Sequence, residues 1–506
     1  MRRVPHDLLQ EIFLACLPTD RNPSLSADEA PILITQVCSH WRHVAHSTPQ
    51  LWASVHVAIP GYQGDVEYGE LENIIHQRSA AVKDWIRLAG ALPLTISAYE
   101  GHSLYATSYF SEFLQECLVP ICDRWKDLSL SAYADSISNI QRLSTDQTPQ
   151  LKSLHLAIKR RNGPEWDSPS GTWEQDVPVA ETWNDGGGIL GGQSLRELRL
   201  SVFDIPWEVT SKWNLLTTLV LNEDGRSNNI PLYSVTSRVK AVLRETKALI
   251  DCTLRIGHFD ETWPHNETND ANDAFKDLPI ELLLLKTLSI AEYPRVTLLP
   301  LLRTPSIRCM AYSRLVASFP PHNHPFLDFL VLNPGIHIEE LSVDPNNITP
   351  FEMLESLRLC SSLRLLHLEL QAPLEPWIQR FGPAAAGHPF TDELLTELAP
   401  PLNRDLAPAL CPNLEDITFM RETQFSETAV VEFVKRKQDG DRHGMGKLRN
   451  IKVNFVRKKG ERDLVAELAL YQDSGLAMEF YYHPSNLRSP LSHYNGLASS
   501  SGITCW

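Results

Sequence analysis

The sequence predicts an α/β protein in which a small helical N-terminal region precedes an irregular solenoid of short parallel strands. Three observations support this fold class. A leucine pattern of the form L-x-x-L-x-L, or a close variant, returns many times between residues 125 and 453. Helical or polar segments of variable length separate its copies. Residues 4–52 instead have the periodicity of amphipathic helices.

A first helix is expected shortly after Val4. Pro5 suits the first helical turn, where its missing N–H would have no partner anyway, and Asp7 places a negative charge near the positive end of the helix dipole. Apolar residues at helical spacing follow, and Pro18 ends the pattern. We expect them to share one face of the helix: Leu8, Leu9, Ile12, Phe13 and Cys16.

A second helix is expected from about Glu29 until Thr48-Pro49. Its apolar stripe comprises Leu33, Val37, Trp41, Val44 and Ala45. Two such short helices carry more large apolar side chains than they can hide from each other. Either the surplus packs on the next part of the chain, or part of it is a docking surface for another protein.

Taken together, these positions resemble the F-box pattern. The resemblance rests on Val4-Pro5, Leu8-Leu9, Ile12-Phe13, Val37-Cys38, Trp41-Arg42 and Leu51-Trp52, in that order. Val4 stands where leucine is usual, and the long loop at 18–28 and the segment 47–52 resemble the large F-box families of mushroom-forming fungi. The resemblance implies binding to the Skp adaptor and, through it, to a cullin. The implied adaptor contacts are Pro5, Leu8, Leu9, Ile12, Val37 and Trp41.

The leucine pattern indicates one short strand per copy, because alternating apolar residues face a core while the residues between them face away. A single strand cannot bury its own apolar side, so neighbouring copies must stack. The clear copies begin at Trp125, Leu151, Leu195, Leu216, Leu285, Leu327, Ile338, Leu363, Leu414 and Leu448, with weaker ones at Leu92, Cys252 and Ile307.

This pattern resembles leucine-rich repeats, although the spacing is irregular. Leu327 and Ile338 start copies 11 residues apart, whereas Leu363 and Leu414 are 51 apart, and regular repeats keep about 20–29. The asparagine ladder of regular repeats is mostly missing, with Asn222 and Asn333 as partial exceptions. An ordinary α/β domain with buried parallel strands is the alternative.

The expected organisation has four parts. Residues 1–58 form the F-box, and residues 59–90 form a linker with a helix over about 70–87 that Gly90 caps. A short strand is expected at Val55–Ile59. The irregular solenoid spans 91–484, with strands on its concave side and helices and loops outside, and 485–506 is expected to be a disordered tail.

Residues between the inward leucines should form one shared face of the solenoid. It would include His155, Arg199, Thr218, Ser342, His367, Thr418 and Lys452. Solenoids commonly bind partners on such a face, so we expect an unknown target protein there. The alternative is a face that is merely solvated or covered by inserted loops.

The net charge, the apolar runs and the cysteines of the chain exclude some classes of partner. A formal net charge of −16 over 506 residues argues against nucleic acid, which requires a positive surface. No apolar run approaches the roughly 20 residues that span a bilayer, and no apolar core follows Arg2-Arg3 as in a signal peptide. Nine cysteines without a CxxC pair suggest reduced thiols in the cytoplasm or nucleus.

Patterns that could indicate chemistry are better explained as solvated loops. The glycines at 186–192 lack a Gly-Lys-Ser/Thr ending, His322 and His324 lack further ligands, and the acidic residues between Asp260 and Asp273 lack calcium-loop spacing. We therefore expect no catalytic site, cofactor or metal. The sequence favours a substrate receptor of a Skp–cullin–F-box ubiquitin ligase. A non-catalytic scaffold whose N-terminal helices only cap the solenoid is the alternative.

Overall fold

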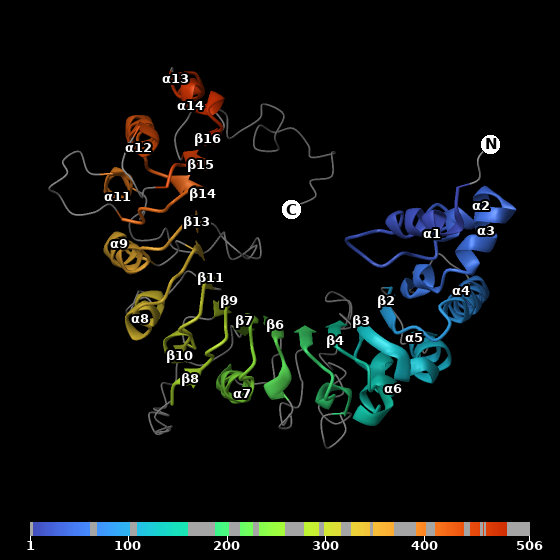
Figure 1. Cartoon of the computed structure of the whole chain (residues 1–506). Helices are drawn as coiled ribbons and strands as arrows, with labels where there is room; N and C mark the ends of the chain where they lie inside the picture. The colour runs from blue at the N-terminus through green and yellow to red at the C-terminus, as the bar shows by residue number, and fades with distance from the viewer. Residues whose placement is uncertain are drawn as a thin grey trace, which may run out of the picture. The chain divides into compact units, whose positions relative to one another are not determined.

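The computed structural model describes most of the chain (Figure 1). The described residues are 4–60, 68–101, 109–159, 188–201, 213–225, 232–258, 278–292, 298–314, 325–344, 348–368, 391–400, 410–439, 446–455, 459 and 462–482. They divide into two compact units. The first comprises Met1–Ile230 and Ser237–Leu249, and the second comprises Pro231–Thr236 and Ile250–Trp506.

The first unit begins with three short helices and continues with parallel strands. The opening elements are α1 (His6–Ala15), α2 (Ile32–Val37), α3 (Ser39–His46) and the 3₁₀ helix η1 (Pro49–Trp52). The strands follow in chain order, each parallel to its neighbours: β1 (Ser54–Ile59), β2 (Leu94–Glu100), β3 (Trp125–Tyr133), β4 (Ser153–Lys159), β5 (Glu197–Ser201) and β6 (Thr218–Gly225).

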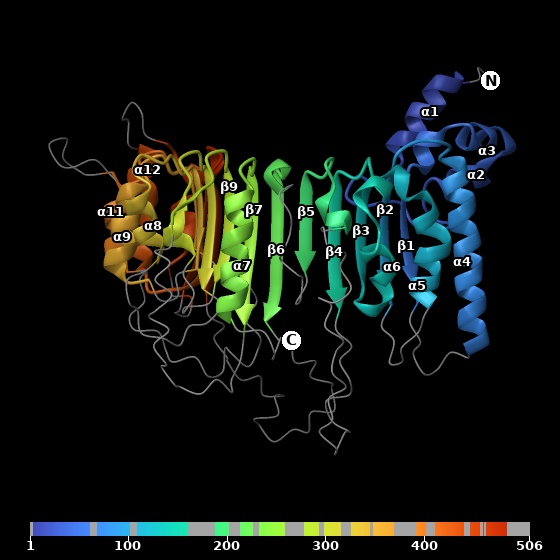
Figure 2. The ribbon, with the colours of Figure 1, turned by 90° about the horizontal axis from the view of Figure 1, so that it is seen from below.

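Helices connect these strands and lie along one face of the sheet (Figure 2). They are α4 (Tyr68–Leu88), α5 (Tyr109–Phe113) and α6 (Ser138–Gln141), and a π-helical turn (Leu114–Leu118) with a 3₁₀ helix (Val119–Arg124) links α5 to β3. Helix α7 (Leu232–Glu245) follows β6, and its residues from Ser237 onward belong to the first unit. The predicted strand at 55–59 and helix at 70–87 are confirmed. Gly90 has the positive φ of 60° expected of a residue that ends a helix.

The second unit repeats the plan. Its parallel strands are β7 (Asp251–His258), β9 (Thr287–Glu292), β11 (Cys309–Arg314), β12 (Glu340–Val343), β13 (Leu365–Leu368), β14 (Asp416–Thr423), β15 (Asn450–Phe455) and β16 (Ala477–Tyr482). Its helices are α8 (Pro325–Leu332), α9 (Pro350–Leu359), α11 (Asp392–Leu398), α12 (Glu427–Asp439), α13 (Leu464–Glu467) and α14 (Ala469–Asp473), and β8 (Ile280–Glu281) and β10 (Leu302–Arg303) form a small second sheet.

The leucine pattern forms the core of both units. Leu128, Leu154, Leu198 and Leu219 are cross-strand partners on consecutive strands, and each is at most 1% exposed. Burying a leucine side chain stabilises a fold by about 1.5–3 kcal/mol, so a ladder of such residues supplies much of the driving force for stacking. Each unit is thus a solenoid-like α/β array, as the sequence predicts.

Two helical details differ from the sequence expectation. The copy beginning at Leu327 is not a strand but lies in α8, which Pro325 begins. The side chains buried in α8 are instead Phe326, Phe329 and Leu330, which share one side of a helix, whereas Leu332 is 43% exposed. The expected second N-terminal helix is two helices, because Cys38 is extended, with φ −161° and ψ 168°. Its Sγ accepts a hydrogen bond from the Trp41 N–H at 3.4 Å and so caps α3.

The asparagine singled out at 333 has a different role from a repeat ladder. It is buried at the end of α8, where its Nδ2 donates to the carbonyl oxygens of Leu302 and Phe329 and its Oδ1 accepts from the Thr304 N–H, each at 2.9 Å.

Buried carboxylates fix other turns. Glu100, at the end of β2, accepts from the Tyr133 N–H and the Ser136 hydroxyl, each at 2.9 Å.

His322 and His324, the acidic segment 260–273 and the tail lie outside the described residues. The glycine cluster at 186–192 is a correction, because its part from Gly188 to Gly191 forms a buried 3₁₀ helix and not a solvated loop. Among the residues that are described, no helix is both long and apolar enough to cross a bilayer.

Candidate functional site

Helix α1 has two apolar sides, and only one of them faces the protein interior. Leu9 and Phe13 are buried, with 4% and 0% of their surfaces exposed. Val4, Leu8 and Ile12 are 47%, 55% and 49% exposed. Because four residues are about one helical turn, Leu8 and Ile12 share an outward side of α1, and the exposed Val4 lies just before the helix, ahead of its N-cap Pro5.

Helix α2 repeats this division. Ile34 is buried at 5% exposure, whereas Leu33 and Val37 are 46% and 57% exposed. Helix α3 packs against both α1 and α2, so the three helices form one group (Figures 1 and 2). We call Val4, Leu8, Ile12, Leu33 and Val37 together the outer apolar surface. Exposed apolar side chains gathered in this way are typical of protein-binding surfaces.

Trp41 links this surface to the interior. Its ring centroid lies 5.0 Å from that of the fully buried Phe13, with the two planes tilted by 55°. The indole is half-buried, so one side packs on α1 while the rest remains open to solvent. A rigid aromatic side chain held in this manner is typical of the residues that dominate protein interfaces.

Hydrogen bonds hold the helices in place. Gln10 on α1 donates through Nε2 to the Thr48 hydroxyl at 3.0 Å, and that hydroxyl donates to the Val44 carbonyl at 2.7 Å. Trp52 donates through Nε1 to the Ala45 carbonyl at 2.9 Å, and its ring meets Trp85 of α4 edge-on at 4.9 Å. The outer apolar surface therefore stands on a packed base.

The loop between α1 and α2 covers the outer edge of β1. The His56 N–H donates to the Pro23 carbonyl at 2.7 Å, and Ser24 forms an isolated parallel bridge with His56. Asn22 reaches β2, where its Nδ2 donates to the Ser97 hydroxyl at 3.0 Å. The loop thus completes the first edge of the sheet, which would otherwise expose unpaired backbone groups.

An ion pair closes this loop. Arg21 lies 2.8 Å from Glu29, which also accepts a hydrogen bond from the Ser24 hydroxyl at 2.6 Å. Burial would raise the pKa of Glu29, but the hydrogen bonds from Ser24 and Arg21 outweigh it and the pKa is lowered. Burial, with the positive charge of Arg21, lowers the pKa of His56.

Five of the six residues expected to contact an adaptor reach the surface. Pro5, Leu8, Ile12 and Val37 are exposed and Trp41 is half-buried. Leu9 is a correction, since it points inward with Phe13. Adjacent leucines on a helix differ in direction by about 100°, so Leu8 and Leu9 could not both face outward. The exposed Leu33 was missed as a surface residue, although its place four residues before Val37 indicated it.

No protein-family model matches the chain, and no curated protein matches it.

In the first unit, the predicted target-binding residues lie on the sheet face opposite the helices. His155 and Arg199 are cross-strand neighbours on β4 and β5, and Ser129 is the β3 partner of His155. The His155 Nδ1 lies 3.1 Å from the Ser129 hydroxyl. Burial, and then the charge of Arg199, lowers the pKa of His155. Thr218 lies in a separate row, opposite Glu197.

In the second unit, the structure brings the remaining four together. Ser342, His367, Thr418 and Lys452 are successive partners on β12, β13, β14 and β15. Lys452 forms a 2.8 Å ion pair with Glu479 on β16. Thr418 is a correction, because it is only 6% exposed. Its short side chain stands between the longer ones of His367 and Lys452, which leaves it little surface for a partner.

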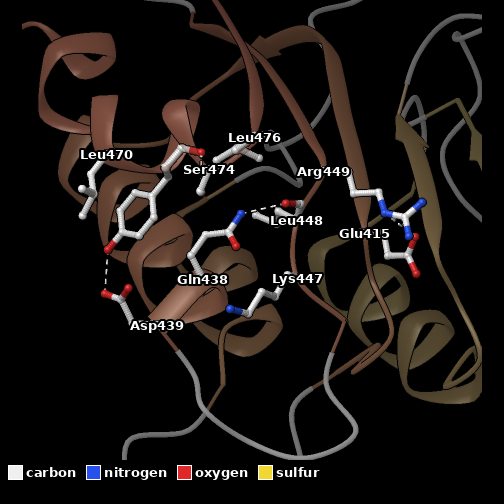
Figure 3. Close-up of a pocket in the computed structure, with 11 residues that line it drawn as sticks. Glu415, Gln438, Asp439, Lys447, Leu448, Arg449, Leu470, Ser474 and Leu476 are labelled. Carbon is white, nitrogen blue, oxygen red and sulfur yellow. Dashed lines mark hydrogen bonds and ion pairs between the residues drawn. The ribbon is translucent and has the colours of Figure 1, made fainter.

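A pocket of about 590 Å³ opens in the second unit (Figure 3). Several of its polar groups already bond to one another. The Tyr471 hydroxyl donates to Asp439 at 2.6 Å, and burial and that carboxylate raise the pKa of Tyr471 to about 12. Arg449 lies 3.3 Å from Glu415. Lys447, Gln438 and Ser474 also contribute to the polar lining, and Leu448, Leu470 and Leu476 form its apolar part.

These arrangements favour binding of a macromolecule. Within the described residues, no group of three or more histidine, cysteine, aspartate or glutamate side chains is placed to hold a metal ion. The outer apolar surface is the feature that a partner would stabilise most, because contact would remove its large apolar side chains from water.

Proposed function

We propose that the chain is a substrate-recognition subunit of a Skp–cullin–F-box ubiquitin ligase. The outer apolar surface, with Trp41 beside it, would bind the Skp adaptor, and the polar sheet faces would hold a target protein. The chain would do no chemistry itself. It would raise the concentration of the target near a ubiquitin-conjugating enzyme that the ligase recruits.

The observation that carries this proposal is the exposed side of α1 formed by Leu8 and Ile12, with the exposed Val4 just before the helix, while the other side of α1 is already packed. A helix that served only as a cap would need a single apolar side. The second apolar side costs free energy in water unless a partner covers it. The order of the F-box-like residues along the chain then favours the Skp adaptor as that partner.

The test is a binding measurement between the purified full chain and a Skp adaptor. We expect wild type to bind and a Leu8→Ala/Val37→Ala variant to lose most of its affinity. Both residues are more than half exposed, so the fold should survive the change. Central interface residues often contribute about 2 kcal/mol or more each, so the double change should weaken binding by roughly a thousandfold.

The matched control is Phe351→Ala/Leu470→Ala. These side chains are 68% and 75% exposed but belong to α9 and α14 of the second unit. The control should bind the adaptor like wild type. If wild type does not bind, or if the Leu8→Ala/Val37→Ala variant binds as tightly as wild type, the proposal is wrong.

A second candidate function is a non-catalytic scaffold in which residues 1–58 serve only as a cap. The cover that Pro23 and Ser24 provide over β1 favours it, since solenoids need such ends. On this account, Leu8→Ala/Val37→Ala should leave every interaction of the chain unchanged. The adaptor measurement therefore separates the two functions.

A further inference from the structure

The second unit ends in a strand whose outer side is less covered than those before it. Within the described part of the chain, β16 pairs with β15 alone. Ile451 and Val453 on β15 are 0% exposed. Their partners on β16, Met478 and Phe480, are both half-buried. The row of apolar side chains that is fully buried on β15 is therefore partly exposed on β16.

The backbone of β16 also has hydrogen-bonding groups directed away from β15. The Ala477 N–H donates to the Arg449 carbonyl at 2.9 Å, which sets the phase of the parallel pairing. Along a strand, successive residues direct their N–H and C=O groups to opposite sides. Ala477 and Glu479 therefore bond toward β15, while the groups of Met478 and Phe480 point outward.

The outer edge of β1 is not open to a strand from a second copy. The outer edge of β1 is occupied by the Pro23 carbonyl and the Ser24 bridge to His56. A head-to-tail contact in which β16 of one copy pairs with β1 of another is therefore blocked. Among the residues that the structure describes, only β15 pairs with β16, so a two-fold contact in which β16 meets β16 is open, and it closes as a dimer.

We propose that β16 pairs antiparallel with β16 of a second copy, about a two-fold axis at Phe480. In this register Phe480 faces its own equivalent and Met478 faces Tyr482. Each of these pairs joins residues whose backbone groups point outward, as an antiparallel hydrogen-bonded pair requires. The aromatic and apolar side chains of both copies then cover each other on the helix side of the sheet.

Charge selects this register over its neighbour. With Phe480 on the axis, Glu479 faces Tyr481 of the second copy, whose hydroxyl already donates to Glu479 within one chain. A register shifted by two residues would place Glu479 opposite its own equivalent. Like charges directly opposite each other on neighbouring strands are destabilising. The dimer does not depend on adaptor binding and leaves the outer apolar surface of each copy in place.

The test uses charge exchange at the axis. The full chain is purified as wild type, Phe480→Lys and Phe480→Glu, and its mass in solution is measured over a range of micromolar concentrations. Wild type should be a dimer. Each variant alone should be a monomer, because two like charges would meet on the axis. An equal mixture should recover a dimer with an affinity at least about tenfold higher than that of either variant alone.

Phe351→Lys is the matched control, since this exposed phenylalanine lies in α9 and should leave the dimer intact. A chain ending at residue 482 tests whether the segment after β16 covers the strand instead. A monomeric wild type, or one that becomes dimeric only in the shortened chain, would overturn the proposal. So would a mixture of the two charged variants that stays monomeric.

Discussion

Lys437 offers a measurable consequence of placing a charge in the core. It lies on α12 with 2% of its surface exposed, and its Nζ donates to the carbonyl oxygens of Pro412 and Cys411 at 3.3 and 3.5 Å. Within the described residues, no carboxylate pairs with it. Burial lowers the pKa of Lys437 from 10.5 to about 8, although the neighbouring Cys411 acts in the opposite direction.

The lowered pKa of Lys437 means that burying its charge destabilises the folded state at neutral pH. Below the folded-state pKa, the lysine is charged in both the folded and unfolded chain, and the folded state bears the full cost of burying the charge. One pKa unit is worth about 1.4 kcal/mol, so a fall from 10.5 to about 8 corresponds to about 3 kcal/mol. Between these values the unfolded chain binds more protons. The free energy of unfolding should therefore rise as the pH rises through this window.

Lys437→Met keeps the length of the side chain and removes the charge. We expect it to raise the free energy of unfolding of the second unit by about 2 kcal/mol at neutral pH, after the loss of two long hydrogen bonds is subtracted. The gain should shrink as the pH approaches the value of the free lysine. Urea unfolding at neutral pH and at about pH 10 measures both effects.

Lys435→Met is the control, because Lys435 is exposed on the same helix and pairs with Glu467. It should change stability by less than about 1 kcal/mol at either pH. The reasoning about Lys437 fails if Lys437→Met is no more stable than wild type at neutral pH, or if the two respond equally to alkali.

Three further predictions concern packing and capping. Gly446→Ala should destabilise the second unit by about 1–3 kcal/mol in urea, because the added Cβ would stand 2.7 Å from the Asn413 carbonyl oxygen. Gly192→Ala is the control and should be nearly neutral, because no atom would lie nearer than 3.7 Å to its Cβ. Cys38→Ser should raise the thermal midpoint and Cys38→Ala should lower it, because a hydroxyl is the better N-cap; the cap is worth about 1 kcal/mol. Phe13→Ala should cost about 3–5 kcal/mol and change the near-ultraviolet circular dichroism of the neighbouring Trp41.

The repeated strands could be predicted because the signal is periodic and local. Each of β3, β4, β5, β6, β9, β12, β13, β14 and β15 coincides with a copy of the leucine pattern. The weaker copies at Leu92, Cys252 and Ile307 mark β2, β7 and β11. Alternation along a strand also placed Ser342, His367 and Lys452 on one shared face, and the register of the structure then aligns them in one row.

The remaining details depend on contacts that a local pattern does not contain. The leucines at 327, 330 and 332 match the strand pattern, but Phe326, Phe329 and Leu330 form the buried side of a helix that Pro325 begins. Leu8 and Leu9 are chemically identical, and which of them is buried depends on the side that α1 turns toward the interior, the side that also carries Phe13. Strand β16 lacks the leading leucine spacing and was not anticipated. The loop over β1 depends on a bridge between Ser24 and His56 that has no sequence signature.

Charged residues just before the strands of the second unit restrict how this array can change in length. Arg308 pairs with Glu339 at 2.9 Å, Glu415 pairs with Arg364 at 3.0 Å and with Arg449, and Glu339 acts electrostatically on Arg364. The signs therefore alternate along five consecutive strands. Deleting one whole repeat would bring two like charges together, whereas deleting two adjacent repeats would restore the alternation. Duplications and losses in this part of the gene should therefore be tolerated more readily in pairs than singly.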